Sequence, residues 1–262
     1  MSPLNDNKVL ALCDEIWNWR LRESPELSTF CGLYHYEESW DDISSEAYHR
    51  REHCLKAFLE QALSLDVQAC SKDVTLSHML LVEDMKMYLQ ACTFPCHLMP
   101  INYLEGAHVD CCRTISFMKF DGEDDFAKYI QRLNAMPKKI HQTIELLKEG
   151  VSEGVVLFIS SIQNIPKQIE SMVNPNDVDE SGLMKPFTED HPNIEADTLE
   201  SFHRQARSVI VTSIFPELVE LKNYLEREGL RKYHIQENNQ VMLENHFNGE
   251  SQLKDIPWIG QT

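Results

Sequence analysis

Apolar residues recur along most of the chain at the three- and four-residue spacing of an amphipathic helix. In residues 6–22, Val9, Leu12, Cys13 and Ile16 fall on one side, and Pro25 follows the end of this segment. Such a stripe predicts a helix with one buried face. The same spacing predicts further helices over residues 44–65, 74–92, 123–136, 140–150, 160–173 and 196–228.

Capping residues, prolines and glycines mark the expected boundaries of these helices. Ser44 or Ser45 is a candidate N-cap for the second helix. Pro137 is expected to break or kink the helix that begins at Glu123, and Pro216 to interrupt the last one. The composition of residues 93–122 predicts an irregular section, and that of 174–193 a long surface loop. No segment alternates in the manner of a strand, so the expected fold is all-α: an irregular multi-helix array with long connecting loops and little or no β-structure.

The chain of 262 residues is strongly acidic, because 42 Asp and Glu oppose 24 Lys and Arg and give a formal net charge of −18. A field of this sign repels phosphate groups, so we expect neither nucleic acid nor a membrane as a partner. No apolar run approaches the roughly 20 residues that span a bilayer. The first ten residues lack a signal-peptide pattern, and the eight cysteines include no Cys-x-x-Cys pair. We therefore expect a cytoplasmic protein with reduced thiols.

The sharpest short motif is 49-HRREH-53, which fits the inverted zinc-peptidase pattern His-x-x-Glu-His. His49 and His53 are four residues apart, so both could reach one zinc ion from the same helix face. They fall, however, on the polar face of the predicted helix, well away from Leu55 and Ala62 on its apolar face. A solvated polar face therefore explains the motif better than a metal site does.

Side chains that can bind metal are also concentrated in 97-HLMPINYLEGAHVDCC-112. The spacings differ from those of zinc sites, and the successive side chains of Cys111 and Cys112 diverge. We expect the two cysteines to act as small apolar residues and His108 to cap or hydrogen bond to the loop backbone. The residues of this chain thus predict no cofactor.

Five segments then follow one another in a recognisable order. They are 24-SPELSTFCGLYHYEESWDDISSEA-47, 100-PINYLEGAHVD-110, 124-DDFAKYIQRLNAMP-137, 146-LLKEGVSEGVV-156 and 209-VIVTSIFPELVELKNYLERE-228. In this order they resemble the bacterial family filed as domain of unknown function 885, which also has invertebrate members. The resemblance covers about residues 9–230. We therefore expect a helical domain over 1–230 and a divergent tail over 231–262.

Members of that family look like metal-dependent peptidases with a helical fold, and their metal motif contains Pro-Gly-His-His in the C-terminal half. This chain has no Pro-Gly-His-His. The resemblance therefore carries over no catalytic or metal-binding residue, and zinc is expected only in a full-length relative. It implies the N-terminal, substrate-cleft-forming portion of a metal-dependent hydrolase, truncated and inactive alone. Such a portion is expected to associate with itself or with the missing C-terminal half.

On this interpretation the loop 100–110 lines the substrate cleft, and its candidate residues are Asn102, Gly106, His108 and Asp110. Gly106 permits a positive φ or a close backbone approach. His108 and Asp110 would form hydrogen bonds or orient a group rather than hold a metal. The alternative function is a non-catalytic acidic helical binding or scaffold protein, which the net charge and the missing motif both favour.

Overall fold

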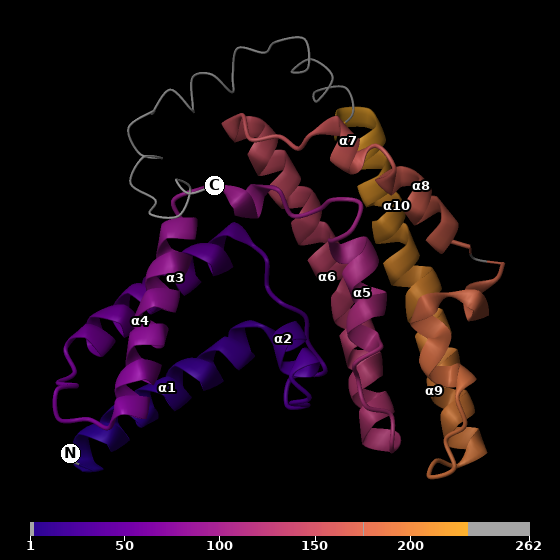
Figure 1. Cartoon of the computed structure of the whole chain (residues 1–262). Coiled ribbons are helices and arrows are strands. Elements are labelled where there is room, and N and C mark those ends of the chain that lie inside the picture. Colours follow the sequence, from indigo (N-terminus) through magenta and orange to yellow (C-terminus); the bar gives the residue numbers. More distant parts are fainter. Residues whose placement is uncertain (1–2, 175, 230–262) are drawn as a thin grey trace, which may run out of the picture.

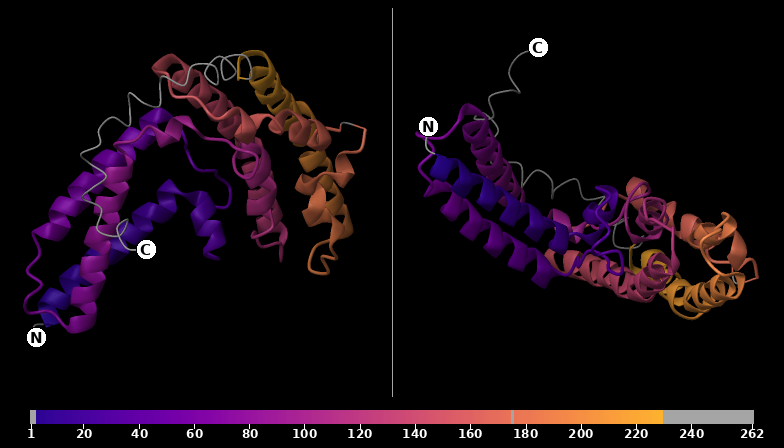
Figure 2. Two further views of the ribbon diagram at one scale, coloured as in Figure 1. Left: turned by 45° about the horizontal axis from the view of Figure 1, so that its top comes forward. Right: turned by 90° about the horizontal axis from the view of Figure 1, so that it is seen from below.

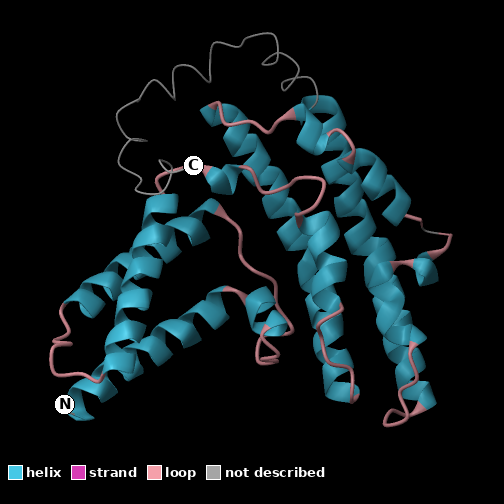
Figure 3. Cartoon of the chain, in the orientation of Figure 1, coloured by secondary structure: helices cyan, strands magenta, loops and turns pink. Residues whose placement is uncertain are grey.

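The computed structural model describes residues 3–174 and 176–229, and every regular element within them is a helix (Figures 1 and 3). The all-α prediction is therefore confirmed. The tail expected over 231–262 lies outside the described residues. None of the described helices is long and apolar enough to cross a lipid bilayer. The helices are α1 (Pro3–Glu23), α2 (Pro25–Phe30), α3 (Ser45–Leu63), α4 (Lys72–Ala91), η1 (Cys96–Leu98), α5 (Ala107–Ile115), α6 (Glu123–Glu153), α7 (Ile159–Ile162), α8 (Ile165–Met172), η2 (Val178–Glu180), η3 (Gly182–Thr188), α9 (Ala196–Val209), η4 (Ile210–Ile214), α10 (Phe215–Tyr224) and η5 (Leu225–Gly229).

Helices α1, α3 and α4 pack on one another and form the N-terminal arm of the molecule (Figure 1). Their apolar stripes meet in a core of their own, which includes Leu12 and Ile16 of α1, Leu55 of α3 and Met85 of α4. Helix α3 begins as expected, because the Ser44 hydroxyl accepts a hydrogen bond from the backbone N–H of Ala47 at 3.2 Å. Such a cap satisfies one of the free N–H groups of the first turn.

The long helix α6 is the centre of the second arm, where it packs against α5, α9 and α10. Pro137 lies inside this helix, which continues without a break from Glu123 to Glu153, so the expected break does not occur. A proline there removes one backbone hydrogen bond and crowds the preceding turn. Leu133, Met136 and Ile140 on either side of it are buried in the core of this arm. This packing holds the helix together across the proline.

Two segments expected to be irregular contain ordered, buried structure. Residues 107–115 form α5, whose Cys111 and Ile115 are buried in the core of the second arm. Residues 174–193, expected to be a surface loop, contain η2 and η3 and bury Val178 and Leu183 in the same core. Isolated apolar residues among polar ones give no periodic pattern, and burial here depends on the α6 and α9 surfaces beneath them.

The last helical region is interrupted where the sequence predicts. Residues 210–214 are π-helical, and α10 begins immediately after them with Pro216 in its first turn. Because the helical run continues from α9 into α10, the proline removes a hydrogen bond to the preceding turn, and this is the turn that widens to a π-helix. The prediction of an interruption at Pro216 is therefore confirmed.

The two arms diverge, and α2 lies between them with the segment 39–44 (Figures 1 and 2). Arg132 of α6 joins this region to the second arm and is fully buried. Its guanidinium donates hydrogen bonds to the Ser39 carbonyl (2.9 Å), the Thr29 hydroxyl (2.9 Å) and the Pro25 carbonyl (3.3 Å). The Trp40 indole donates in return to the Arg132 carbonyl at 2.7 Å. A hydrogen-bonded network around the buried Arg132 therefore holds α2 and the 39–44 segment to the second arm.

Candidate functional site

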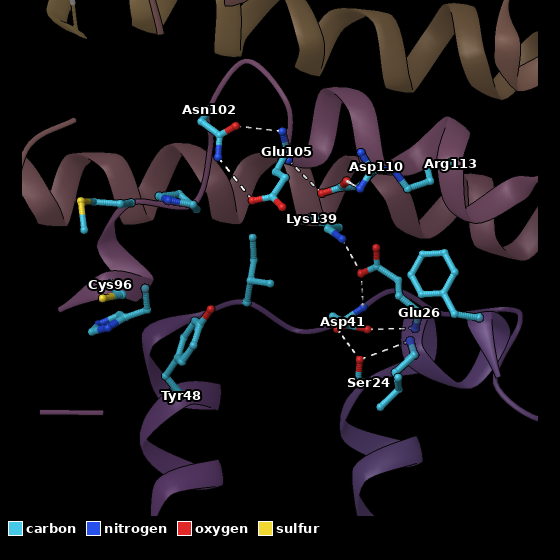
Figure 4. A pocket seen from close by; sticks show the side chains of 17 residues that line it. Ser24, Glu26, Asp41, Tyr48, Cys96, Asn102, Glu105, Asp110, Arg113 and Lys139 are labelled. Carbon is cyan, nitrogen blue, oxygen red and sulfur yellow. Dashed lines mark hydrogen bonds and ion pairs between the residues drawn. The ribbon is translucent and has the colours of Figure 1, made fainter. Parts of the chain in front are cut away.

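A pocket of about 460 Å³ lies where the two arms meet, and we call it the junction pocket (Figure 4). One wall comes from α2, the 41–43 segment and the start of α3, and the opposite wall from residues 96–113. Its size is within the range of small-molecule sites in proteins. The lining residues are Ser24, Glu26, Leu27, Phe30, Asp41, Ile43, Tyr48, Cys96, His97, Met99, Pro100, Asn102, Glu105, Gly106, Asp110, Arg113 and Lys139.

The wall formed by α2 is a fixed polar framework. Glu26 and Lys139 form a buried ion pair. Asp41 accepts hydrogen bonds from the Ser24 hydroxyl at 2.6 Å and from the backbone N–H of Glu26 at 3.0 Å. Burial raises the pKa of Glu26, although the positive charge of Lys139 opposes this shift. These groups are already satisfied by one another, so they shape the pocket and are poorly available to a ligand.

The opposite wall is a tight loop closed by Asn102. The Asn102 side-chain oxygen accepts from the backbone N–H groups of Leu104 (2.8 Å) and Glu105 (3.1 Å). Gly106 follows with φ 123° and ψ 172°, a conformation that is essentially restricted to glycine. Its N–H donates to the Asp110 carboxylate at 2.8 Å. Asn102, Gly106 and Asp110 therefore all line the pocket and hold the loop in shape, and their role in substrate binding stays a prediction.

The junction pocket has more carboxylates than cations, four against two. Two of the carboxylates are in ion pairs with the two cations, namely Glu26 with Lys139 and Asp110 with Arg113. Asp41 and Glu105 have no ion-pair partner in the described part of the chain. Glu105 is exposed, its carboxylate has only a long hydrogen bond of 3.4 Å from the Asn102 amide, and it points into the pocket (Figure 4). Glu105 is therefore the carboxylate most available to a ligand.

His108, the fourth residue expected in the cleft, does not line the junction pocket. It is fully buried behind the loop, and its Nε2 lies 3.3 Å from the side-chain oxygen of Gln168 on α8. The Gln168 amide donates to the Tyr103 carbonyl at 3.0 Å. His108 thus supports the loop from the second arm through Gln168. Its Nδ1 has no hydrogen-bond partner among the described residues.

We expect this histidine to make the folded chain sensitive to acid. Burial lowers the pKa of His108, and the contact with Gln168 offsets this only in part. The unfolded chain therefore takes up a proton as the pH falls through the ordinary value of 6.5, whereas the folded chain resists it. The resulting stability is fully present above that value and is lost as the pH falls below it.

The test compares the free energy of unfolding at about pH 7.5 and about pH 5 by urea denaturation. The wild-type chain should lose more stability over this interval than His108→Gln, which has no imidazole to protonate at this position. His141→Gln, at an exposed position, should behave like the wild type. If the wild type and His108→Gln lose equal stability between the two pH values, His108 is not the source of the acid sensitivity.

The histidine pair of 49-HRREH-53 lies on the solvent face of α3. Both His49 and His53 are exposed, and the centroids of the His49 and His97 rings are 6.5 Å apart. Within residues 3–174 and 176–229, no group of three or more His, Cys, Asp or Glu is placed to hold a metal ion.

Sequence reasoning missed Glu26, Asp41 and Lys139, which build the α2 wall. Lys139 carried a usable signal, because it falls on the buried face of α6 between Met136 and Thr143. A charged residue at a core position of a helix needs a buried partner of opposite charge. The identity of that partner is not readable from the sequence, because Glu26 is 113 positions away.

A family model described as "Bacterial protein of unknown function (DUF885)" matches residues 25–249. The match includes every residue of the junction pocket except Ser24. It begins after α1 and continues beyond residue 230, where the sequence suggested the boundary of the helical domain. A search of curated proteins gives no match.

Proposed function

Because the chain belongs to this family of bacterial proteins of unknown function, we propose that it forms the substrate-binding wall of a hydrolase that acts on peptides. In this proposal the junction pocket binds the amino-terminal ammonium group of the peptide. The observation that supports it is the Glu105 carboxylate, which points into the pocket and has no cation as partner among the described residues. Many molecules carry a free amine. We favour a peptide because the sequence resembles a family whose members look like peptidases.

An ammonium group fits the charges of this pocket. It would donate to Glu105 and compensate the excess of carboxylates over cations. Hydrogen bonds between charged groups are about twice as strong as those between neutral groups. The net charge of −18 would also draw a cationic ligand towards the chain. A ligand carboxylate or phosphate has no such partner, because Arg113 and Lys139 are already paired.

In this role the described residues bind and orient the peptide, and they contribute no chemistry to the cleavage. Asn102 fixes the loop that carries Glu105, and Asp110 fixes the glycine that follows it. Groups held by their neighbours in this way lose little freedom when a ligand binds. Metal and catalytic groups would have to come from elsewhere in the functional hydrolase.

The proposal predicts that binding of a short peptide depends on its free amine and on Glu105. We expect Ala-Ala-Ala amide to bind, and Glu105→Gln to weaken its binding by roughly ten- to hundredfold, because a hydrogen bond to a charged group is lost. Isothermal titration calorimetry measures the dissociation constants directly. Acetylation of the peptide should weaken its binding to the wild type by a similar factor.

Glu220→Gln is the matched control, since it removes the same charge from an exposed position on α10 outside the junction pocket. It should leave the dissociation constant unchanged. Equal affinity of free and acetylated peptide, or equal losses in the two variants, would contradict the ammonium site. Metal-dependent cleavage of the peptide by the purified chain, followed by mass spectrometry, would contradict the restriction to binding.

A non-catalytic binding or scaffold protein is the second candidate. The observation that favours it is a row of exposed apolar side chains on α4, which consists of Leu76, Met79, Leu80 and Met87. Exposed apolar rows of this kind often mark protein contacts. Failure of the junction pocket to bind any free-amine peptide would favour this function over the first.

A further inference from the structure

A second, smaller cavity of about 250 Å³ adjoins the junction pocket, and we call it the side pocket. The two cavities share Tyr48, Cys96 and His97 as lining residues. Tyr48 and Cys96 lie together at one end of the junction pocket in Figure 4. A ligand in the junction pocket can therefore place a substituent in the side pocket. The side pocket is lined by Tyr48, His49, Glu52, Tyr88, Ala91, Cys92, Phe94, Cys96 and His97.

The walls of the side pocket are mostly aromatic and apolar. Tyr48 of α3 and Tyr88 of α4 come from the two facing helices, and Phe94 from the turn after α4. The His97 ring packs against the Tyr48 ring, with 4.9 Å between centroids. Phe94 is 59% exposed, which is high for a phenylalanine. An apolar ligand group would cover this ring.

The charges around the side pocket argue against a charged occupant. Glu52 is the one acidic residue among its lining, and its carboxylate accepts from Lys56 at 2.7 Å. A cationic group would have to compete with Lys56 for this carboxylate, and an anionic group would be repelled by it. An uncharged aromatic or large aliphatic group meets neither problem and gains from contact with the rings.

The size of the side pocket argues for a single side chain. Its volume of about 250 Å³ is below the range of roughly 300–1,000 Å³ for sites that hold whole drug-sized ligands. The junction pocket beside it is large enough for the polar end of a peptide. The two cavities therefore suit a peptide end: the junction pocket suits its polar backbone, and the side pocket suits one apolar side chain.

We propose that the side pocket selects peptides by the side chain of their first residue, and that it takes an aromatic or large aliphatic one. The inference rests on the proposed function, because it is the ammonium group at Glu105 that brings the first residue to the junction pocket. Tyr48, shared by both cavities, contacts the first residue on its way into the recess. The specificity is for an uncharged apolar side chain over a small or a cationic one.

The test compares three peptide amides by calorimetry: Phe-Ala-Ala, Ala-Ala-Ala and Lys-Ala-Ala. We expect the wild type to bind Phe-Ala-Ala roughly ten- to hundredfold more tightly than Ala-Ala-Ala, the effect of burying one large apolar side chain. Ala91→Leu fills the side pocket from the last residue of α4. It should bring the ratio of the two affinities close to one.

Ala57→Leu is the matched control, because it adds the same atoms at an exposed position of α3 outside both cavities. It should keep the wild-type preference, whereas Phe94→Ala should reduce the preference without filling the pocket. Equal binding of all three peptides, with Glu105→Gln still weakening each, would overturn this inference and leave the proposed function intact. Tightest binding of Lys-Ala-Ala would also overturn it. Loss of all binding to the wild type would instead refute the proposed function.

Discussion

Replacing Arg132 with methionine is expected to lower the free energy of unfolding by about 3–5 kcal/mol, the usual range for removing one member of a buried charged network. Arg132 is fully buried and donates to three acceptors, in Pro25, Thr29 and Ser39. Methionine has a similar length and no donor. The substitution therefore removes three hydrogen bonds at once. The Pro25 carbonyl keeps a donor in the Thr29 hydroxyl, whereas each buried acceptor that is left without a donor costs roughly 1–3 kcal/mol.

The charge of Arg132 adds to this effect. Its guanidinium lies near the carboxylates of Glu26 and Glu37 and over the Trp40 ring, 5.0 Å from the centroid. Glu37 is fully buried, and its carboxylate has a long ion pair of 4.0 Å with Lys128. Removal of the cation leaves these buried carboxylates less compensated, which disfavours the folded state.

Urea denaturation followed by circular dichroism measures the change at pH 7. The control is Arg204→Met, because Arg204 is 70% exposed on α9 and its ion pair with Glu200 is long at 4.0 Å. Exposed substitutions of this kind change stability by less than about 0.5 kcal/mol. A loss at Arg132 no larger than that at Arg204 would show that the buried network contributes little.

The substitution Gly106→Ala is expected to lower the free energy of unfolding by about 2–5 kcal/mol. With φ 123° and ψ 172°, the residue has a backbone conformation that an L-side chain adopts only under strain. A Cβ there would also lie 2.7 Å from Ile101 Cγ1 and 3.2 Å from Ile101 Cα. Ile101 is buried in the core of the second arm, so it has little space to move.

Gly122→Ala is the matched control, since that glycine has φ −150° and a Cβ there would meet nothing within 4 Å. Because Gly122 is an N-cap residue, Gly122→Ala should lower the free energy of unfolding by less than about 1 kcal/mol. The same titrations with Ala-Ala-Ala amide should show weaker binding for Gly106→Ala, because the strained loop carries Glu105. Equal stability losses for the two glycines would contradict the strain at Gly106.

The helices could be predicted from the sequence wherever their apolar residues repeat regularly. The stripe of Val9, Leu12 and Ile16 located α1, and the Ser44 cap located the start of α3. These signals are local, so they need no knowledge of distant parts of the chain. Pro137 disfavours a helix locally, but the helix continues through it because the residues on either side are buried in the core.

The site was less predictable because its key contacts join distant positions. Asn102, Gly106 and Asp110 could be grouped from the sequence because they lie in one short segment, and all three line the junction pocket. Glu26 and Lys139 meet only after the arms have packed, and no local pattern pairs them. His108 shows the reverse error, since its place in the loop sequence says nothing about its side chain turning towards α8.

The separate cores of the two arms have a consequence for how the molecule responds to a ligand. Each arm has its own apolar core, and the hydrogen bonds of Arg132 hold α2 and Ser39 to the second arm. The arms can therefore act as two cooperative folding units with a weak thermodynamic coupling between them. The junction pocket is lined by residues of both units, so a peptide bound there would contact both. Its binding would strengthen that coupling. Backbone amides far from the pocket should then exchange hydrogen more slowly in both arms when the peptide is bound.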